Sequence, residues 1–425
     1  MEMKKYKLGE IAEIYNGSTP STKEFDNYDG NIVWATPKDL SDQNSKYFYQ
    51  GARNITQKGF DSCSTQLIPA NNILMSSRAP IGLFAINKVD CCTNQGFKNI
   101  VLDKKIADVD FMYYFLKYHV KEIEALGSGT TFKEVSKTSF EKYEISIPYL
   151  DNQQKIASVL SSLDDKIALN RRMNAKLEQM AKRLYDHWFV QFDFPNADGK
   201  PYKASDGKMV WNETLKRKIP ERWEVKKLGE LFTTNRGVSY STKTITGDTG
   251  IPMINLASFS PDGSYKIDGI KLYTGDYTQE KVLKPFDLVM CNTQQTAIDF
   301  SKDIIGKALL VPDIFEGDIT SSHHVNTLKV HDEKLKFYLY RLFNTDYFHV
   351  YISHFASGTN IMGLDFAGVE NYTAVIPDEK ILSKFANFTL TIEKKKSEII
   401  RENKKLIVLR DRLLPLLMNG QVIVN

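Results

Sequence analysis

The sequence SGTTFKEVSKTSFEKYEISIP, residues 128–148, returns as SGTNIMGLDFAGVENYTAVIP, residues 357–377, at a constant offset of 229 residues. In both copies a serine, a glycine and a threonine open the segment, a proline ends it, and a long amphipathic helical pattern follows. A repeat at fixed spacing decides the architecture before any local motif does, because each copy forms the same supersecondary unit. The chain therefore contains one module twice.

The match extends in both directions from this segment. Downstream it continues without a gap through the helical stretches. Upstream, Lys-Leu-Gly-Glu at residues 7–10 corresponds to residues 227–230 at an offset of 220, nine fewer than 229. Insertions are tolerated in surface loops, and loops commonly hold binding specificity. Two similar scaffolds with different loops suggest two readers of different targets.

Composition bounds the class of protein. The chain has 425 residues, 42% of them hydrophobic, which is enough for two or three domains with their own cores. No run of eighteen apolar residues exists, and residues 1–7 contain no apolar signal core, so we expect a cytoplasmic protein without a membrane span. The four cysteines form no CxxC pair, so neither a zinc site nor a disulfide framework is indicated.

The net charge of +4 neither requires nor excludes nucleic acid. In the first copy, basic and aromatic side chains are interleaved in a way that suits phosphate and base contacts. An ordinary solvated surface around aromatic core residues fits the same composition. The residues concerned are Lys38, Arg53, Lys58, Arg78, Lys98 and Lys133 among Trp34, Tyr47, Phe48, Tyr49 and Phe132.

The repeat predicts an α+β fold in which two similar mixed α/β domains are separated by a pair of long antiparallel coiled-coil helices, with pseudo-twofold symmetry. The expected boundaries are 1–150 for the first domain, 151–190 for the central helical spacer, 191–226 for the linker, 227–378 for the second domain and 379–425 for the C-terminal helical spacer. We expect short strands at 32–35, 72–75 and 100–102, a helix at 111–126, and a last strand at 143–147 or 372–376.

Both helical stretches have the apolar seam of a coiled coil. Apolar positions alternate by four and three residues from Ile156 to Trp188, and the second copy repeats this frame from Phe385 to Leu417. The simplest partner for each seam is the other seam. A helix of about 36 residues spans roughly 54 Å, so the pair is expected to be a rigid spacer with one domain at each end.

Asn174 and Asn403 occupy the same position of the seam, between apolar neighbours that include Leu177 and Leu406. A buried asparagine at such a position typically fixes register and orientation. In an antiparallel pair, the two amides are expected to bond to each other. Three polar residues interrupt the second seam and are expected to be partly exposed or to face another subunit: Thr389, Lys396 and Arg410.

Residues 127–131 and 356–360 are expected to form tight loops. Gly129 and Gly358 let the backbone approach a ligand closely, and the threonines add hydroxyl donors. The loops can cradle a phosphate, although a plain turn explains them as well.

Arg78 follows a strand and can contact guanine in a major groove. Its counterpart in the second copy is residues 292–295, where glutamine can read adenine. A structural salt bridge for Arg78 is the open alternative. The candidate DNA-binding residues are Lys38, Arg78, Gln95, Thr130, Thr131, Lys133, Thr293, Gln294, Thr359 and Asn360.

Two adjacent histidines, His323 and His324, could suggest a metal site. No third ligand stands at helical spacing, and the corresponding residues 94–96 of the first copy are Asn-Gln-Gly, so we expect a polar loop and no metal. The chain also lacks an Asn-Pro-Pro-Phe or Asp-Pro-Pro-Tyr methyltransferase motif, a GxxxxGK[ST] loop and a nuclease-like carboxylate cluster. No catalytic residue is therefore predicted.

Two non-identical readers a fixed distance apart suit a bipartite site on duplex DNA, since half-site spacing mirrors dimer spacing in repressors. About 50 Å corresponds to about 15 base pairs. Such readers imply an asymmetric sequence with an unread gap.

The order of module, helix, module, helix resembles the specificity subunit of type I restriction-modification systems. The resemblance rests on Lys-Leu-Gly-Glu opening each module and Ser-Gly-Thr closing it. It also rests on LYDHWFV at residues 184–190 before Phe-Pro, and on IPERW at 219–223 before the second module. It covers nearly the whole chain, and the recognition loops are its least specific part.

The resemblance implies a subunit that binds double-stranded DNA and performs no chemistry itself. Two modification subunits would dock against the helices and methylate adenine N6 with S-adenosylmethionine, and two restriction subunits would supply the nuclease that uses ATP and Mg. No cofactor is expected in this chain. The residues expected to contact other subunits are Trp188, Phe189, Leu416 and Leu417.

A scaffold protein is the alternative from another class. Two binding modules on a coiled-coil spacer could hold protein partners, and such a protein would lack DNA affinity that falls with added salt.

Overall fold

The computed structural model describes residues 2–43, 45–78, 80–129, 133–245, 247, 249–295, 302–422 and 424. The chain forms two compact units, of which the first comprises residues 1–170 and 403–425 and the second residues 171–402. The boundary crosses both long helices, so each unit contains one domain and a part of each helix. Helices and strands are mixed within each domain, which confirms the expected α+β class.

The main sheet of the first unit has the strand order β2-β8-β5-β6-β4, with β3 paired in parallel to β7 beside it. The expected helix at 111–126 is two helices, α4 and α5, because the backbone leaves helical geometry at His119. The bounds are β1 Met3–Lys7, α1 Leu8–Ile11, β2 Ala12–Asn16, β3 Tyr28–Ala35, α2 Pro37–Asp42, β4 Tyr47–Phe48, α3 Gln57–Asp61, β5 Ile73–Ser76, β6 Phe84–Asn87, β7 Cys91–Thr93, β8 Phe97–Leu102, α4 Val109–Tyr118, α5 Val120–Ala125, α6 Lys137–Glu141 and β9 Glu144–Pro148.

The second unit repeats this topology. Its main sheet has the order β13-β20-β16-β18, which matches β2-β8-β5-β6, and β14 pairs in parallel with β19 as β3 does with β7. The bounds are β10 Met209–Asn212, β11 Arg217–Pro220, β12 Glu224–Lys227, β13 Phe232–Arg236, β14 Ile251–Ile254, β15 Lys271–Tyr273, β16 Leu288–Cys291, β17 Thr293–Gln295, β18 Ala308–Leu310, β19 Thr320–Ser321, β20 Val325–Val330, α8 Leu335–Phe343, α9 Asp346–Ser353, β21 Ala356–Ser357, β22 Ile361–Leu364, α10 Phe366–Asn371 and β23 Thr373–Ile376.

The repeated Lys-Leu-Gly-Glu motif forms the same tight turn in both units. The backbone N–H of Lys7 donates to the Glu10 carboxylate at 2.9 Å, and that of Lys227 donates to Glu230 at 3.1 Å. The turn follows β1 or β12, which pair with β9 and β23 in equivalent registers. The motif therefore joins the first and last strands of each domain to its main sheet.

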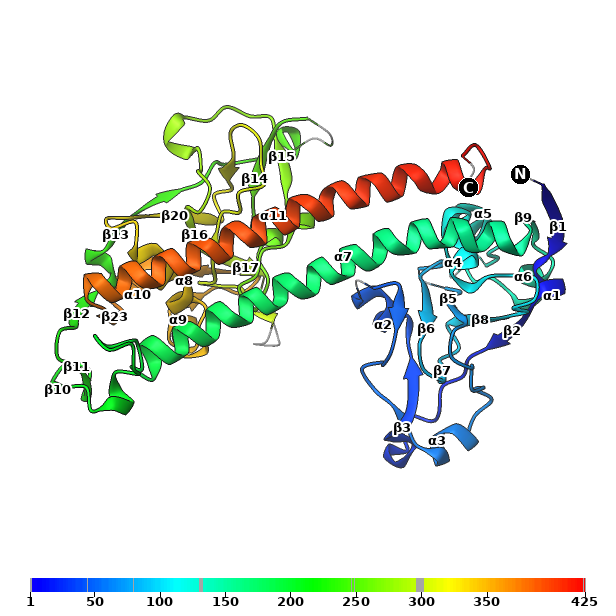
Figure 1. Ribbon diagram of the computed structural model, residues 1–425, viewed down its shortest axis with the longest axis horizontal. Helices are drawn as coiled ribbons and strands as arrows, with labels where there is room; N and C mark the ends of the chain where they lie inside the picture. Colours follow the sequence, from blue (N-terminus) through cyan, green and yellow to red (C-terminus); the bar gives the residue numbers. More distant parts are fainter. Residues whose placement is uncertain are drawn as a thin grey trace. The chain divides into compact units, whose positions relative to one another are not determined.

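The long helices α7 and α11 close the hydrophobic cores of both units (Figure 1). In the first unit, Leu160 near the start of α7 lies in one core with Leu417 at the end of α11. In the second unit, Tyr185 at the end of α7 lies in one core with Phe385 near the start of α11. The start of each helix thus meets the end of the other, and the pair is antiparallel as expected. The bounds are Leu150–Tyr185 for α7 and Glu379–Met418 for α11.

Trp188, Phe189, Leu416 and Leu417 were predicted to contact other subunits. The prediction is wrong for Phe189 and Leu417, because both are buried within this chain. Phe189 is buried in the core of the second unit, with its ring centroid 4.8 Å from that of Phe385, and Trp188 packs against both. Leu417 is buried in the core of the first unit, and Leu416 is half-buried. Phe189 and Leu417 are therefore not free to contact another subunit, whereas Trp188 and Leu416 keep part of their surface exposed and remain candidates.

The predicted bond between Asn174 and Asn403 is replaced by another. Asn403 accepts a hydrogen bond from the side-chain amide of Asn170 at 3.0 Å. In an antiparallel pair, equivalent positions face each other only on the symmetry axis, so Asn174 is expected to face the equivalent of Asn170. That equivalent is Ile399, which is buried and apolar. The carbonyl oxygen of Asn174 accordingly has no hydrogen-bond partner among the described residues.

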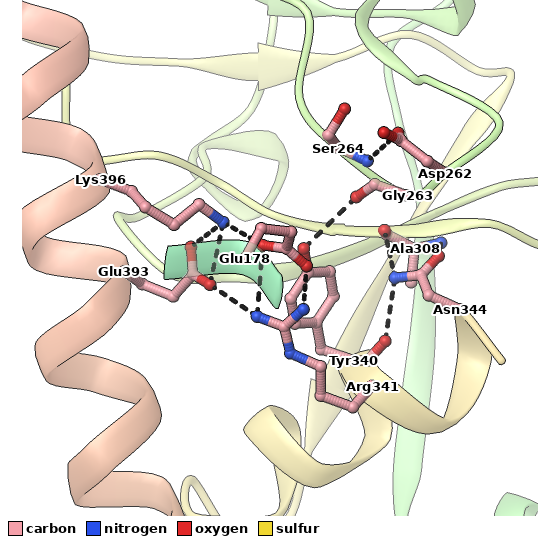
Figure 2. Close-up of polar contacts among 10 residues, drawn as sticks. All are labelled: Glu178, Asp262, Gly263, Ser264, Ala308, Tyr340, Arg341, Asn344, Glu393 and Lys396. Atoms are coloured by element: carbon pink, nitrogen blue, oxygen red, sulfur yellow. Dashed lines mark hydrogen bonds and ion pairs between the residues drawn. The ribbon is translucent and has the colours of Figure 1, made fainter. Parts of the chain in front are cut away.

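Of the polar residues that interrupt the second seam, Lys396 and Arg410 are partly exposed, as expected, but each is paired within this chain. Thr389 is fully buried, and Arg410 pairs with Asp164 at 2.7 Å. Lys396 belongs to a network in the second unit with Glu178 and Glu393, to which Arg341 of α8 contributes the second cation (Figure 2). Lys396 lies 2.6 Å from Glu178 and 2.9 Å from Glu393.

Burial of Phe189 predicts a large effect of truncation. Phe189→Ala should lower the free energy of unfolding by about 3–5 kcal/mol, because the large cavity cannot close completely. Val190→Ala is the matched control, since the Val190 side chain is 44% exposed, and should change stability by less than roughly 0.5 kcal/mol. Denaturant unfolding of both variants measures this, and equal effects would contradict the assignment of Phe189 to the core.

The Glu178 network predicts a dependence of stability on acid pH. Burial alone raises the pKa of Glu178, but Arg341 and Lys396 outweigh burial and hold the pKa below its usual value. The unfolded chain therefore binds this proton first, near pH 4.3, so the stabilisation is complete above that pH and is lost as pH falls further. Glu178→Gln should cost about 3 kcal/mol at pH 7, and its difference from wild type should shrink in acid. Glu379→Gln, at a solvated ion pair with Lys334, is the control and should change the acid transition far less, because exposed ion pairs contribute little. A constant difference between Glu178→Gln and wild type across pH would rule out this account.

Candidate nucleic-acid interface

In the first unit, three separate segments converge beyond the end of β5. The backbone N–H of Ser77 donates to Gly96 at 2.7 Å, and that of Val135 donates to Ser77 at 3.0 Å. A Cβ at Gly96 would lie 3.0 Å from Pro37 Cγ and 3.6 Å from Arg78 Nε. The structure therefore brings Arg78, the loop containing Gln95 and the start of α2 together.

Ser128 and Glu134 form a backbone pair beside Arg78. Ser128 and Glu134 exchange backbone hydrogen bonds of 3.1 and 3.0 Å, and Gly129 has a φ of +123°, which favours glycine. The candidates Thr130 and Thr131 lie outside the described residues. Lys133, next to Glu134, is exposed, and Lys38 is exposed on α2. We call Lys38, Arg78, Gln95 and Lys133 the first interface.

The charge of Arg78 is only partly neutralised. The Glu134 carboxylate lies 3.0 Å from the buried Lys98 ammonium and 4.0 Å from the Arg78 guanidinium, whose side chain stays 37% exposed. The salt bridge considered from the sequence therefore exists, but it is long and partly solvated. Such pairs contribute little, so Arg78 can exchange Glu134 for an acceptor on a ligand.

The second unit has the same backbone framework. The N–H of Asn292 donates to His324 at 3.0 Å, and that of Leu364 donates to Asn292 at 2.9 Å, as Ser77 and Val135 do in the first unit. Thr293 therefore takes the place of Arg78, and the correspondence expected from the sequence is confirmed. Gly358, with a φ of +140°, shapes the hairpin of β21 and β22, on which Thr359 and Asn360 are exposed.

Gln294 is a weaker candidate than the sequence suggested. Its side chain is buried, and its amide oxygen accepts hydrogen bonds from the backbone N–H groups of Ile304 at 2.7 Å and Ile305 at 3.2 Å. The glutamine thus holds a neighbouring loop in place. Its acceptor is already used within the fold, which leaves Thr293 as the better candidate for contact with DNA.

The histidine pair, predicted from the sequence to be a polar loop, lies next to Thr293. His324 Nδ1 lies 2.7 Å from the Thr293 hydroxyl, and the two imidazole centroids are 3.9 Å apart. The Tyr240 ring lies 5.3 Å from His323, with the Lys271 ammonium 5.6 Å from the Tyr240 ring centre. The sequence signal that could have identified this site is the equivalence of His323 with Gln95, a predicted DNA-binding residue of the first copy. We call Thr293, Tyr240, His323 and His324 the second interface.

The surroundings of His324 favour its neutral form. Burial lowers its pKa below the usual value, and His323, Arg236 and Lys271 lower it further. A neutral imidazole has one donor and one acceptor nitrogen, so the second interface offers directional hydrogen bonds where the first offers a cation. Within the described residues, no group of three or more His, Cys, Asp or Glu side chains is arranged to hold a metal ion.

A repeated domain that presents different side chains on one backbone framework defines a two-domain binding protein. Residues 1–179 and 220–402 match the family described as the type I restriction modification DNA specificity domain. The chain belongs to this family, the non-catalytic DNA-recognition subunits of type I restriction-modification systems.

Individual relatives agree with this assignment. The chain is 32% identical to the MjaIX specificity subunit of Methanocaldococcus jannaschii, over 98% of this chain and 92% of that protein. It is 24% identical to the HindI specificity subunit of Haemophilus influenzae, over 99% and 100% of the two chains. The fold is similar to the crystal structure of the S subunit from M. genitalium, with a TM-score of 0.57, 15% identity and coverage of 98% and 96%. In the part of the chain that the structure describes, no helix is both long and apolar enough to cross a bilayer.

Exposure of Arg78 predicts a specific effect on DNA affinity. Arg78→Ala should weaken binding by about 1–3 kcal/mol and lower the slope of log affinity against log salt by about 1 if the contact is to phosphate. Lys104→Ala is the control, because Lys104 follows the other end of β8, roughly 20 Å along that strand, and should leave binding unchanged. Fluorescence anisotropy across a salt series measures both, and equal losses would exclude a local contact by Arg78.

Proposed function

We propose that this chain selects the DNA sequence for a type I modification and restriction complex, with each domain reading one half of an asymmetric bipartite site. The observation that supports this most is the pair of equivalent interfaces with unlike chemistry. Arg78 corresponds to Thr293, and Gln95 corresponds to His323, on backbone hydrogen bonds that are the same in both units. Equal frameworks with different donors and acceptors suit two different half-sites.

The two interfaces would read bases by different means. The partly exposed guanidinium of Arg78 fits the paired acceptors of guanine in the major groove. In the second interface, the His324 ring provides a donor and an acceptor and Tyr240 provides an apolar face, and Asn360 on the adjacent hairpin adds an exposed amide. Lys38 and Lys133 suit phosphates, which set position without specifying sequence.

Partner subunits would supply the chemistry. Two modification subunits would transfer the methyl group of S-adenosylmethionine to adenine N6, and two restriction subunits would use ATP and Mg to translocate and cut DNA. With Phe189 and Leu417 buried, the apolar side chains left for docking lie on the outer faces of the helices. Met180 of α7 is 51% exposed and Val408 of α11 is 62% exposed.

Methylation mapping tests the division of labour between the domains. The chain is co-expressed with its modification subunit, and methyladenine is located by single-molecule sequencing of host DNA. Arg78→Ala should relax one half of the methylated motif and His324→Ala the other half. Lys104→Ala should leave both halves unchanged.

Two outcomes would contradict the proposal. Relaxation of the same half by both variants would exclude separate readers. Methylation that is identical with and without this chain, despite expression of both proteins, would exclude the specificity role altogether.

A further inference from the structure

The acidic and basic side chains where the helices meet the domains differ between the two units. In the first unit, Asp164 of α7 accepts a 2.6 Å hydrogen bond from Tyr114 of α4 and pairs with Arg410 of α11 at 2.7 Å. In the second unit, Arg341 of α8 pairs with Glu178 of α7, and at 3.1 Å with Glu393 of α11.

The repeat relates these residues to one another. Asp164 and Glu393 are equivalent at the offset of 229, so in each unit the helix that follows the domain supplies an acid. The residues from the other helix are not equivalent. Arg410 corresponds to Ala181, and Glu178 corresponds to Ile407. The first unit thus receives a base from the other helix, whereas the second unit receives an acid.

Two copies of the chain could also pair through the same half, the first half with the first or the second with the second. The difference between the units makes such pairing of like halves unfavourable. If α11 of a second copy replaced α7 in the second unit, Ile407 would take the place of Glu178. The buried Arg341 and the largely buried Lys396, whose side chain is 16% exposed, would then share the single carboxylate of Glu393. Two largely desolvated cations with one anion are costly, because removing one partner leaves the other charge desolvated and unpaired.

The first unit makes the pairing of two first halves unfavourable in the same way. If α7 of a second copy replaced α11, Ala181 would take the place of Arg410. Asp164, whose side chain is only 16% exposed, would lose the guanidinium that lies against it. When α7 and α11 of one chain pair, the charged side chains of both units have their partners. Selectivity of this kind is the difference in free energy between the right and wrong partners.

We propose that Glu178 and Arg410 make the two halves of this chain select each other and reject second copies of themselves. The partner excluded is a like half of another copy of the chain. The consequence is one assembly with two different domains on a shared helix pair, and this pairing rule does not depend on what the domains bind.

An exchange of four residues tests the inference. The variant E178I/A181R/I407E/R410A moves both charges to the equivalent positions on the opposite helices and keeps composition and net charge unchanged. The full chain is purified, cleaved once at a protease site placed in the exposed turn at residues 197–200, unfolded in urea and refolded by dilution. Native mass spectrometry then counts like and unlike pairs of the two fragments.

Refolded wild type should give unlike pairs. The four-residue variant should raise the ratio of like to unlike pairs roughly a hundredfold or more, which corresponds to breaking and remaking buried ion pairs. The matched control is Q179V/V408Q, an exchange at equivalent exposed positions, and it should leave the ratio of like to unlike pairs at the wild-type value. An unchanged ratio in the four-residue variant, or like pairs in refolded wild type, would overturn the proposal.

A second variant tests the inference if the four-residue variant does not refold. A181R/R410A moves the guanidinium alone and keeps Glu178, Arg341, Glu393 and Lys396, although in the unlike pair it places the new arginine at the buried Ala181 position of the second unit. It should give like pairs of the first fragment, since the guanidinium introduced by A181R then faces Asp164 of the other copy. If it refolds only into unlike pairs with the thermal stability of wild type, the charges do not select the partner.

Discussion

The structure depends on cores that neither domain completes with its own module. Leu417 and Met418, at the end of α11, are buried in the core of the first unit, and Tyr185 and Phe189 are buried in the core of the second. Burying one such side chain stabilises a fold by roughly 1.5–3 kcal/mol. Folding of each domain is therefore coupled to the antiparallel pairing of the two helices, and residues far apart in sequence become neighbours in the interior.

That coupling explains why charged groups lie inside both units. The helices bring polar residues of the seam against a domain, where desolvation is costly unless each charge finds an opposite one. Arg341 meets Glu178 and Glu393, and Arg410 meets Asp164. These pairs add directional constraints to an apolar seam that alone would tolerate several registers. A single well-defined pairing of the helices follows.

The candidate interfaces lie outside this constraint. Their framework consists of backbone hydrogen bonds, such as Ser77 to Gly96 and Asn292 to His324, which do not depend on side-chain identity. Arg78 in one unit can therefore be threonine in the other, and Gly96 can be histidine, with the main chain unchanged. This separation allows recognition to vary while the cores and helices stay fixed.

The sequence by itself determined the duplication, the mixed domains, the long antiparallel helices and the alignment of the two interfaces, because periodicity and offset are properties of the chain order. Tertiary structure alone decided that Asn403 bonds to Asn170, that Phe189 and Leu417 close cores, that Gln294 supports a loop, and that His324 joins Thr293. Periodicity identifies the apolar face of a helix but not the residue opposite it. In an antiparallel pair that residue is set by the position of the symmetry axis, which only the packed cores define.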